Sequence, residues 1–368
     1  MNDTSPRHLV HPDVTSTLYD EAARCRSLRA AWSLVAADRA WHLLDARDFT
    51  GLDVAEHDEL ASRLRATRLG WAARTATRDV QLAYALTALA DVGVEPVVLK
   101  GTALGWTLYP QAVMRPGQDV DLLVDERQLP AVDVVLRRLG YELPYGVRGR
   151  QTSHQRLYVR ELSGGARVQL DVHGRISNRH RFAGSLPWQT LRGRATPVAL
   201  PVPGAGVAFA IAHEDAFVHA VVHLYAHHGV GERPALWFED LRRLAQVLVD
   251  AGRWASVAQR VEELELCSLA RDAVVLASAR LGWWPPDLVM RAVRSWPDDS
   301  SGAFLRPGRL RDIASDLTHL PGWYERAQYV AELVAPSPEQ MRAGWSEQGD
   351  ESVLRLHARR LHRLARRR

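Results

Sequence analysis

Two aspartates within a short apolar run are the first residues whose type and spacing suggest chemistry. Asp119 and Asp121 flank Val120 and are followed by Leu122. Because side chains two residues apart in a strand lie on the same face, both carboxylates are expected to project together while the apolar residues pack behind them. Like charges this close repel each other unless a cation neutralises them, and carboxylate oxygens suit Mg²⁺ or Mn²⁺. The pair predicts a metal site, but Asp-x-Asp alone is a weak signal because it is common.

A third aspartate strengthens this prediction. Asp171 lies in the apolar stretch 168–173, which is long enough for another strand. If that strand pairs with the one that carries the first two aspartates, Asp171 completes a cluster of three carboxylates. Such a cluster can hold two metal ions about 3.5–4 Å apart around a transferring phosphate.

A basic turn precedes the aspartates in the chain. Lys100 is the single lysine among 47 basic residues, which suggests a position where a compact ammonium is needed and the planar guanidinium of arginine would not fit. Gly101 and Thr102 follow it at the expected end of a strand, where glycine lets backbone N–H groups approach a phosphate and a helix N-terminus favours its charge. The turn is predicted to bind phosphate, although it does not have the spacing of a Walker loop.

The elements that must position these residues form a small mixed α/β domain at residues 93–200. Apolar and β-branched runs predict strands at residues 95–99, 120–124, 156–161 and 166–172, and helical spacing predicts helices at residues 103–109 and 127–139. An N-terminal helical region at 1–92 precedes this domain. A C-terminal helical domain at 201–368 follows it, with a first helix predicted at residues 207–228 and a basic tail at its end. The chain is therefore expected to be α+β.

Several short motifs together resemble a bacterial family of poorly characterised nucleotidyltransferases in the DNA-polymerase-beta-like superfamily. They are the run at residues 97–104, Tyr109-Pro110, Met114-Arg115-Pro116, the strand at residues 119–124 and Leu170-Asp171-Val172-His173. The similarity covers residues 93–175, with weaker agreement after residue 206. It implies a minimal nucleotidyltransferase palm, a mixed sheet with helices, flanked by helical regions. The usual Gly-Gly or Gly-Ser turn of the superfamily is Lys-Gly-Thr here, which implies a different hold on the phosphates.

The resemblance also implies roles for the site residues. Asp119 and Asp121 would bind the metal ions, and Asp171 would be a further ligand and a candidate base for the acceptor. Lys100, with Gly101 and Thr102, would hold the triphosphate.

Four other polar residues have alternative interpretations. Arg115 either clamps a phosphate or forms an ion pair with one of the aspartates. His173 is expected to be a buried residue that orients Asp171, with a substrate contact as the alternative. His223 either packs against Asp240 or contacts the acceptor.

Histidines recur along one predicted helix at four-residue spacing. His219, His223 and His227 share one face, and His228 follows, so a zinc site is an alternative to structural pairing. Phe217 stands where an H-E-x-x-H motif starting at His213 would need its second histidine, which excludes that metalloprotease signature.

Composition limits the other functional classes. No apolar run approaches the roughly 18 residues of a membrane span, and the N-terminus lacks the apolar segment of a secretory signal, so a cytoplasmic location is expected. The two cysteines form neither a disulfide framework nor a metal site. The arginine-rich residues 355–368 either contact an anionic partner or, as we favour, form a solvated terminal helix.

These features predict a metal-dependent enzyme that transfers NMP from an NTP, with ATP favoured, to an acceptor and releases pyrophosphate. A sugar, another small molecule or a peptide is favoured as acceptor over nucleic acid, while the oligomeric state stays open. The alternatives are a phosphotransferase that moves the γ-phosphate and a nucleotide-binding scaffold without activity.

Overall fold

The computed structural model describes residues 14–144, 151–200, 202, 206–226, 233–306 and 308–334, together with residues 352, 355 and 358. His227, His228 and most of the basic tail at residues 355–368 lie outside the described residues.

A mixed sheet of six strands forms the centre of the fold, in the order β3-β4-β2-β1-β6-β5. The strands are β1 (Val97–Val98), β2 (Val120–Leu123), β3 (Gln155–Glu161), β4 (Arg167–His173), β5 (Thr196–Ala199) and β6 (Val207–Ala210). The central strand β2 is parallel to β4 and antiparallel to β1. All four predicted strands are present, so the α+β prediction is confirmed.

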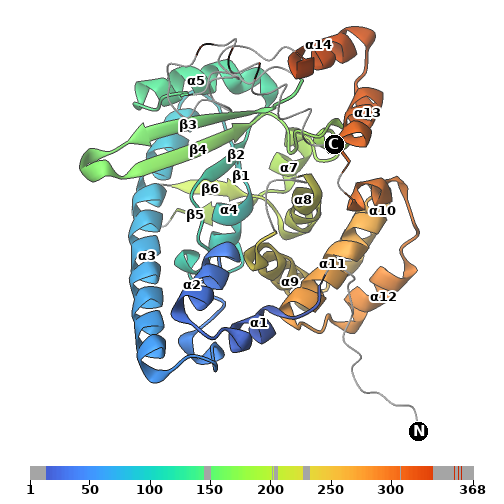
Figure 1. The fold of residues 1–368 in the computed structure, drawn as a ribbon. Helices are drawn as coiled ribbons and strands as arrows, with labels where there is room; N and C mark the ends of the chain where they lie inside the picture. Colours follow the sequence, from blue (N-terminus) through green and yellow to red (C-terminus); the bar gives the residue numbers. More distant parts are fainter. Residues whose placement is uncertain are drawn as a thin grey trace.

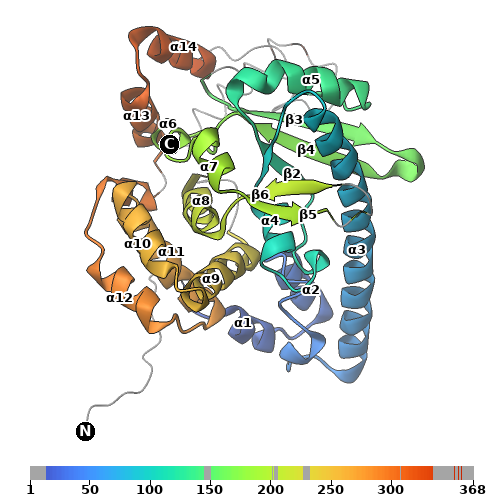
Figure 2. The same cartoon turned by 180° about the vertical axis from the view of Figure 1, so that it is seen from behind.

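The helices surround this sheet. They are α1 (Leu18–Arg24), α2 (Leu28–Ala37), α3 (Val54–Ala90), α4 (Lys100–Thr107), α5 (Leu129–Arg138), α6 (His180–Ala183), α7 (Trp188–Arg194), α8 (His213–Ala226), α9 (Ala235–Asp250), α10 (Trp254–Glu263), α11 (Cys267–Leu281), α12 (Asp287–Ser295), α13 (Arg309–His319) and α14 (Trp323–Val334). Figures 1 and 2 show the long helix α3 on one side of the molecule and α9 to α12 on the opposite side, with the sheet between them. None of the helices in the described part of the chain combines the length and hydropathy of a bilayer crossing.

One prediction about the start of the C-terminal region was wrong. Residues 207–210 were expected to begin a helix, but they form strand β6, and α8 begins only at His213. Strand β6 pairs in parallel with β1, with Val97 opposite Phe209. The free edge of β1 supplies hydrogen-bond partners that a helical segment there would leave unmet. The sheet therefore extends beyond residue 200.

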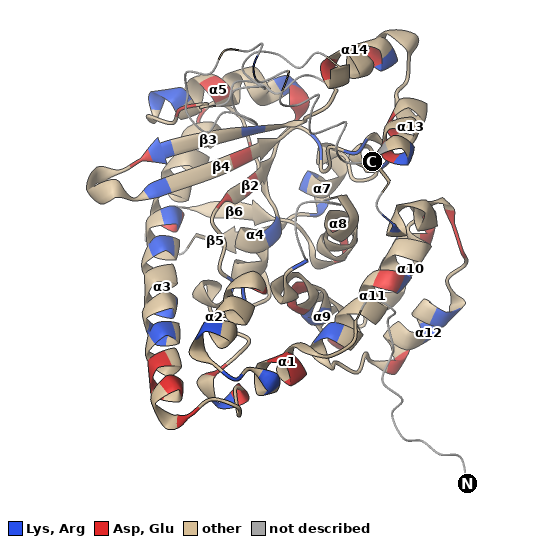
Figure 3. Ribbon diagram, in the orientation of Figure 1, with Lys and Arg blue, Asp and Glu red and all other residues tan. Residues whose placement is uncertain are grey.

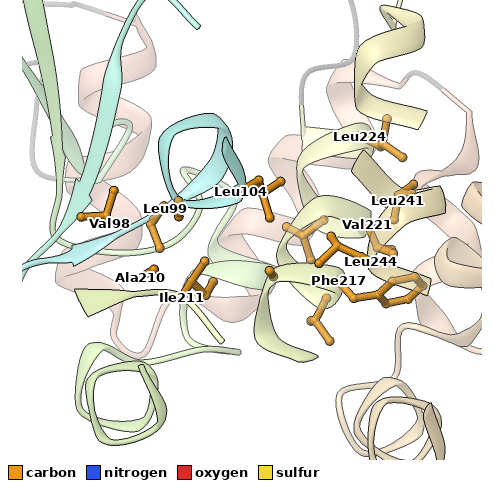
Figure 4. Close-up of a cluster of buried hydrophobic side chains, with 14 of the residues drawn as sticks. Val98, Leu99, Leu104, Ala210, Ile211, Phe217, Val221, Leu224, Leu241 and Leu244 are labelled. Carbon is orange, nitrogen blue, oxygen red and sulfur yellow. The ribbon is translucent and has the colours of Figure 1, made fainter. Parts of the chain in front are cut away.

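A buried apolar cluster fastens the C-terminal helices to the sheet (Figure 4). It joins the β1 end and α4 to β6, α8 and α9 through Val98, Leu99, Leu104, Ala210, Ile211, Phe217, Val221, Leu224, Leu241 and Leu244. Full burial of a leucine, isoleucine or phenylalanine side chain stabilises a fold by about 1.5–3 kcal/mol. This packing fixes α8 and α9 beside the strand ends at which the polar residues gather.

Candidate active site

The pairing of β2 with β4 brings two predicted site residues together. The strands are parallel with Asp121 opposite Asp171, so both carboxylates project from the same face of the sheet. Both residues are buried. Asp121, Asp171 and His173 each offer a ligand atom, and these atoms lie within 4.8 Å of one another. Figure 3 shows the acidic positions of β2 and β4 at one level of the sheet, near a basic position at the start of α4.

The third predicted carboxylate, that of Asp119, is more accessible to solvent than the other two. Asp119 comes just before β2 and is exposed, and with Asp121 and Asp171 it lines a cavity of about 310 Å³. Partial enclosure and then the negative charge of Asp121 raise the pKa of Asp119, and Asp171 adds to this effect. The three acids therefore share one electrostatic environment, although Asp119 is not among the three residues whose ligand atoms cluster within 4.8 Å.

Lys100 points into this acidic group. Its Nζ donates a hydrogen bond to Asp121 Oδ1 at 2.5 Å. Burial alone would lower the pKa of Lys100, but Asp121, with smaller contributions from Asp171 and Asp119, raises it, so the side chain stays an ammonium ion. The backbone of Lys100 is left-handed, with φ of +46°, a conformation that costs a non-glycine residue roughly 1–2 kcal/mol. Helix α4 begins at Lys100 instead of at Ala103 as predicted.

His173 contacts both buried carboxylates through one ring nitrogen. Its Nε2 lies 2.9 Å from Asp121 Oδ1 and 3.3 Å from Asp171 Oδ2. Burial would lower the pKa of His173, but Asp171 and the bonds to both carboxylates raise it to about 9. Although burial opposes it, the charge of Lys100 and the bond from His173 hold the pKa of Asp121 well below its usual range. Asp171 Oδ1 is buried and has no hydrogen-bond partner among the described residues.

The raised pKa of His173 predicts how stability depends on pH in metal-free buffer. Because the folded value of about 9 exceeds the ordinary 6.5, the stabilisation is fully present below pH 6.5 and is lost as pH rises through about 9. The loss should be on the order of 3 kcal/mol. Urea-unfolding midpoints between pH 6 and 10 measure it, and His173→Gln should flatten this part of the curve. A parallel decline in wild type and variant would contradict the assignment.

Arg115 forms an ion pair with an aspartate far away in the sequence. Its Nε and Nη2 donate to the Asp240 carboxylate, the shortest contact being 2.6 Å, and Nη1 donates to the carbonyl of Pro116. The hydroxyl of Tyr109 donates to Asp240 Oδ1 at 2.8 Å. The guanidinium of Arg115 therefore forms a structural ion pair, as in the second of its two predicted roles. Its partner is Asp240 on α9, and not Asp119 or Asp121.

The glycine after Lys100 has a role in packing. A Cβ at Gly101 would lie 2.6 Å from Arg115 Nη1, so no larger residue fits there without displacing that side chain. Thr102 is buried, its hydroxyl has no partner among the described residues, and it is not among the residues that line the cavity. Its phosphate contact stays a prediction.

Helices α8 and α9 form the opposite wall of the cavity. His219, His223 and Trp237 line it together with Gln155 from β3. The ring centroids of His223 and Trp237 lie 4.5 Å apart with the rings tilted by 59°, and those of His219 and His223 lie 6.2 Å apart. A smaller hollow of about 120 Å³ adjoins the cavity and shares Lys100 and Gln155 with it, as well as both histidines. His223 thus lies where the two hollows meet, while Asp240 pairs with Arg115. The zinc alternative depends on His227, which is outside the described residues.

Arg39 and Gln155 line the cavity but were not predicted as site residues, and Arg39 is the charged one of the two. It follows α2 in the N-terminal region and has a left-handed backbone with φ of +50°. No signal marked it, because the region contains many arginines and neither their backbone conformation nor their distance from the aspartates can be read from periodicity.

Known proteins are similar to this chain in family and, more weakly, in structure. A solved structure of the antibiotic-resistance factor ANT(2'')-Ia matches with 16% identity and a TM-score of 0.35, over 51% of this chain and 95% of its own. A nucleotidyltransferase-like protein from Paracoccidioides brasiliensis matches with 16% identity and a TM-score of 0.31, over 54% and 92%. No curated protein matches. Residues 29–282 match the family described as uncharacterised nucleotidyltransferase, and the chain therefore belongs to that family.

Proposed function

We propose that this protein is a metal-dependent enzyme that transfers NMP from an NTP to an acceptor and releases pyrophosphate. The observation that carries the proposal is the register of β2 and β4, which sets Asp121 beside Asp171 with the Lys100 ammonium at 2.5 Å from Asp121. Buried like charges next to a cation are costly as a purely structural device. The arrangement supports phosphate chemistry, as does membership of a nucleotidyltransferase family.

The acidic residues fit a divalent cation. Asp171 Oδ1 is buried, and no group of the described residues donates a hydrogen bond to it, so its desolvation is not offset within that part of the chain. Carboxylate oxygens are the ligands that Mg²⁺ and Mn²⁺ prefer. We assign the metal to Asp121 and Asp171, with Asp119 as the more exposed carboxylate of the cavity. When bound, such ions would offset the charge of the phosphates and lower the pKa of the acceptor group.

Each residue of the chain then has a defined task. The acceptor atom forms a bond to the α-phosphorus while the bridge from that phosphorus to the β-phosphate breaks, and pyrophosphate carries away the released charge. Lys100 is placed to donate to a phosphate oxygen, because Asp121 already directs its ammonium into the cavity. Asp171 has an oxygen for each of its tasks: we assign Oδ1, which has no partner among the described residues, to the metal ion, and Oδ2, which lies 3.3 Å from His173 Nε2, to the acceptor proton. His173 orients both carboxylates.

The acceptor is proposed to enter between the α/β domain, predicted at residues 93–200, and the C-terminal helices. His223 and Gln155 lie where the two hollows join, within reach of a ligand in either one. Their polar groups suit a hydroxyl or amine of a sugar, another small molecule or a peptide. No feature of the described residues selects a particular base. ATP, the donor favoured from the sequence, is therefore the NTP proposed for the experiments.

The products of slow NTP hydrolysis test the reaction type without a known acceptor. ATP labelled at the α- or γ-phosphate is incubated with Mg²⁺ or Mn²⁺, so that water takes the place of the acceptor. We expect labelled AMP from the first substrate and labelled pyrophosphate from the second. The same labels then follow transfer to a panel of hexoses, amino alcohols and serine-containing peptides. Formation of ADP and phosphate, or transfer of label only from the γ-position, would identify a phosphotransferase and overturn the proposal.

A further inference from the structure

The three cationic residues that line the cavity differ in what neutralises them. Lys100 is paired with Asp121, and Arg115 is paired with Asp240. For Arg39, by contrast, no carboxylate of the described residues lies within ion-pair distance, and its side chain remains exposed to solvent. Arg39 is therefore the cavity cation that is free to bind an anionic ligand.

The backbone at Arg39 has a left-handed conformation that sets the direction in which the chain leaves α2. Among the described residues only Arg39, Lys100 and Glu265 combine a positive φ with a side chain larger than that of glycine. Two of these three line the same cavity. At Arg39 this conformation has a local cause: the N–H of Arg39 donates to the carbonyl of Ala36 at 3.3 Å and the N–H of Ala40 donates to the carbonyl of Val35 at 2.9 Å, the hydrogen bonds of a Schellman cap at the end of α2.

The residue before Arg39 connects this helix end to two other helices. Asp38 is buried, and its carboxylate accepts hydrogen bonds from the backbone N–H of Ala235 at 3.0 Å and from Arg280 at 2.7 Å. The Asp38 carbonyl also accepts from the N–H of Leu236 at 3.3 Å. The end of α2 is thus fastened to the N-terminus of α9 and to α11. Because α9 also carries Trp237 into the cavity, Arg39 has a fixed place relative to the cavity wall.

We propose that Arg39 binds the outer phosphates of the NTP, as a second cation beside Lys100. This inference rests on the proposed function. Asp121 and Asp171 are buried and are assigned to the reacting α-phosphate, whereas Asp119 is exposed to solvent and is assigned to the outer part of the triphosphate. Partial enclosure and the charge of Arg115 lower the pKa of Arg39 while Asp119 raises it, which places the guanidinium in the field of that exposed carboxylate. A guanidinium donates two parallel hydrogen bonds to a phosphate, which suits the non-reacting end of the triphosphate.

Binding measurements with ligands that differ in phosphate number test this proposal. Wild type, Arg39→Ala and Arg39→Lys are titrated calorimetrically with ATP, inorganic tripolyphosphate and AMP in the presence of Mn²⁺. Arg39→Ala should weaken ATP and tripolyphosphate about 10- to 100-fold and AMP less than about threefold, because one charge-assisted contact is lost. Arg39→Lys should fall between wild type and Arg39→Ala. Arg29→Ala, on the exposed side of α2, should bind all three ligands as wild type does.

The outcomes separate the two proposals. Equal affinity of wild type and Arg39→Ala for ATP and tripolyphosphate would overturn the role of Arg39 and leave the nucleotidyltransferase assignment intact. An equal loss for AMP and tripolyphosphate, at an unchanged melting temperature, would also overturn it, because the contact would not be with the outer phosphates. Failure of wild type to bind or hydrolyse ATP would overturn both.

Discussion

Asp121→Asn is expected to reduce NTP turnover about 1,000-fold or more, with pyrophosphate release as the measurement. The Asp121 carboxylate is the centre of the site, because Lys100 and His173 both bond to its Oδ1 and Asp171 lies directly opposite it in the sheet. An asparagine fills the same volume but removes the charge that would hold a divalent cation and direct the ammonium. The loss should appear mainly in kcat, because the missing charge acts on the reacting phosphate.

Two controls separate lost chemistry from lost folding. The melting temperature of Asp121→Asn in metal-free buffer reports the effect of the substitution on the fold. Asp91→Asn makes the same chemical change at an exposed position at the end of α3 and should retain full turnover. Retention of pyrophosphate release within tenfold of wild type by a folded Asp121→Asn protein would show that the reaction does not depend on this carboxylate.

Much of the site could be predicted from sequence because its parts are local. Asp121 and Asp171 each lie in an apolar run of strand length, and the alternation of side chains fixes the face on which they project. Only their register required the fold. Lys100 was identifiable because it is the single lysine of the chain. Each of these features depends on a few residues that are adjacent in the chain, so it can be predicted without knowledge of the tertiary structure.

The remaining contacts depend on distant segments. Arg115 pairs with Asp240 across 125 residues, and no periodicity relates α9 to the loop before β2. Arg39 lines the cavity next to Asp38, whose carboxylate binds Ala235 of α9 and Arg280 of α11, two residues far away in the sequence. Residues 207–210 were misread as helix because their composition continues that of the following helix, whereas the open edge of β1 decides in favour of a strand. Tertiary partners, which composition does not reveal, determine each of these cases.

Breaking the buried pair between Arg115 and Asp240 should have the largest effect on stability. Both side chains are about 95% buried, and Asp240 accepts bonds from Arg115 and from the Tyr109 hydroxyl. Asp240→Asn leaves the buried guanidinium without its counter-charge, which should destabilise the protein by about 3–5 kcal/mol. The shift in the midpoint of guanidinium chloride unfolding measures this loss.

A double variant tests whether the loss comes from an unpaired charge or from lost packing. Arg115→Met with Asp240→Leu removes both charges and keeps apolar volume, and it should recover most of the stability lost in Asp240→Asn, because paired removal avoids a buried lone charge. The Tyr109 hydroxyl would lose its partner, so recovery should fall short of wild type by about 1–3 kcal/mol. If the double variant were no more stable than Asp240→Asn, packing at this contact and not charge neutralisation would hold α9 against the cavity.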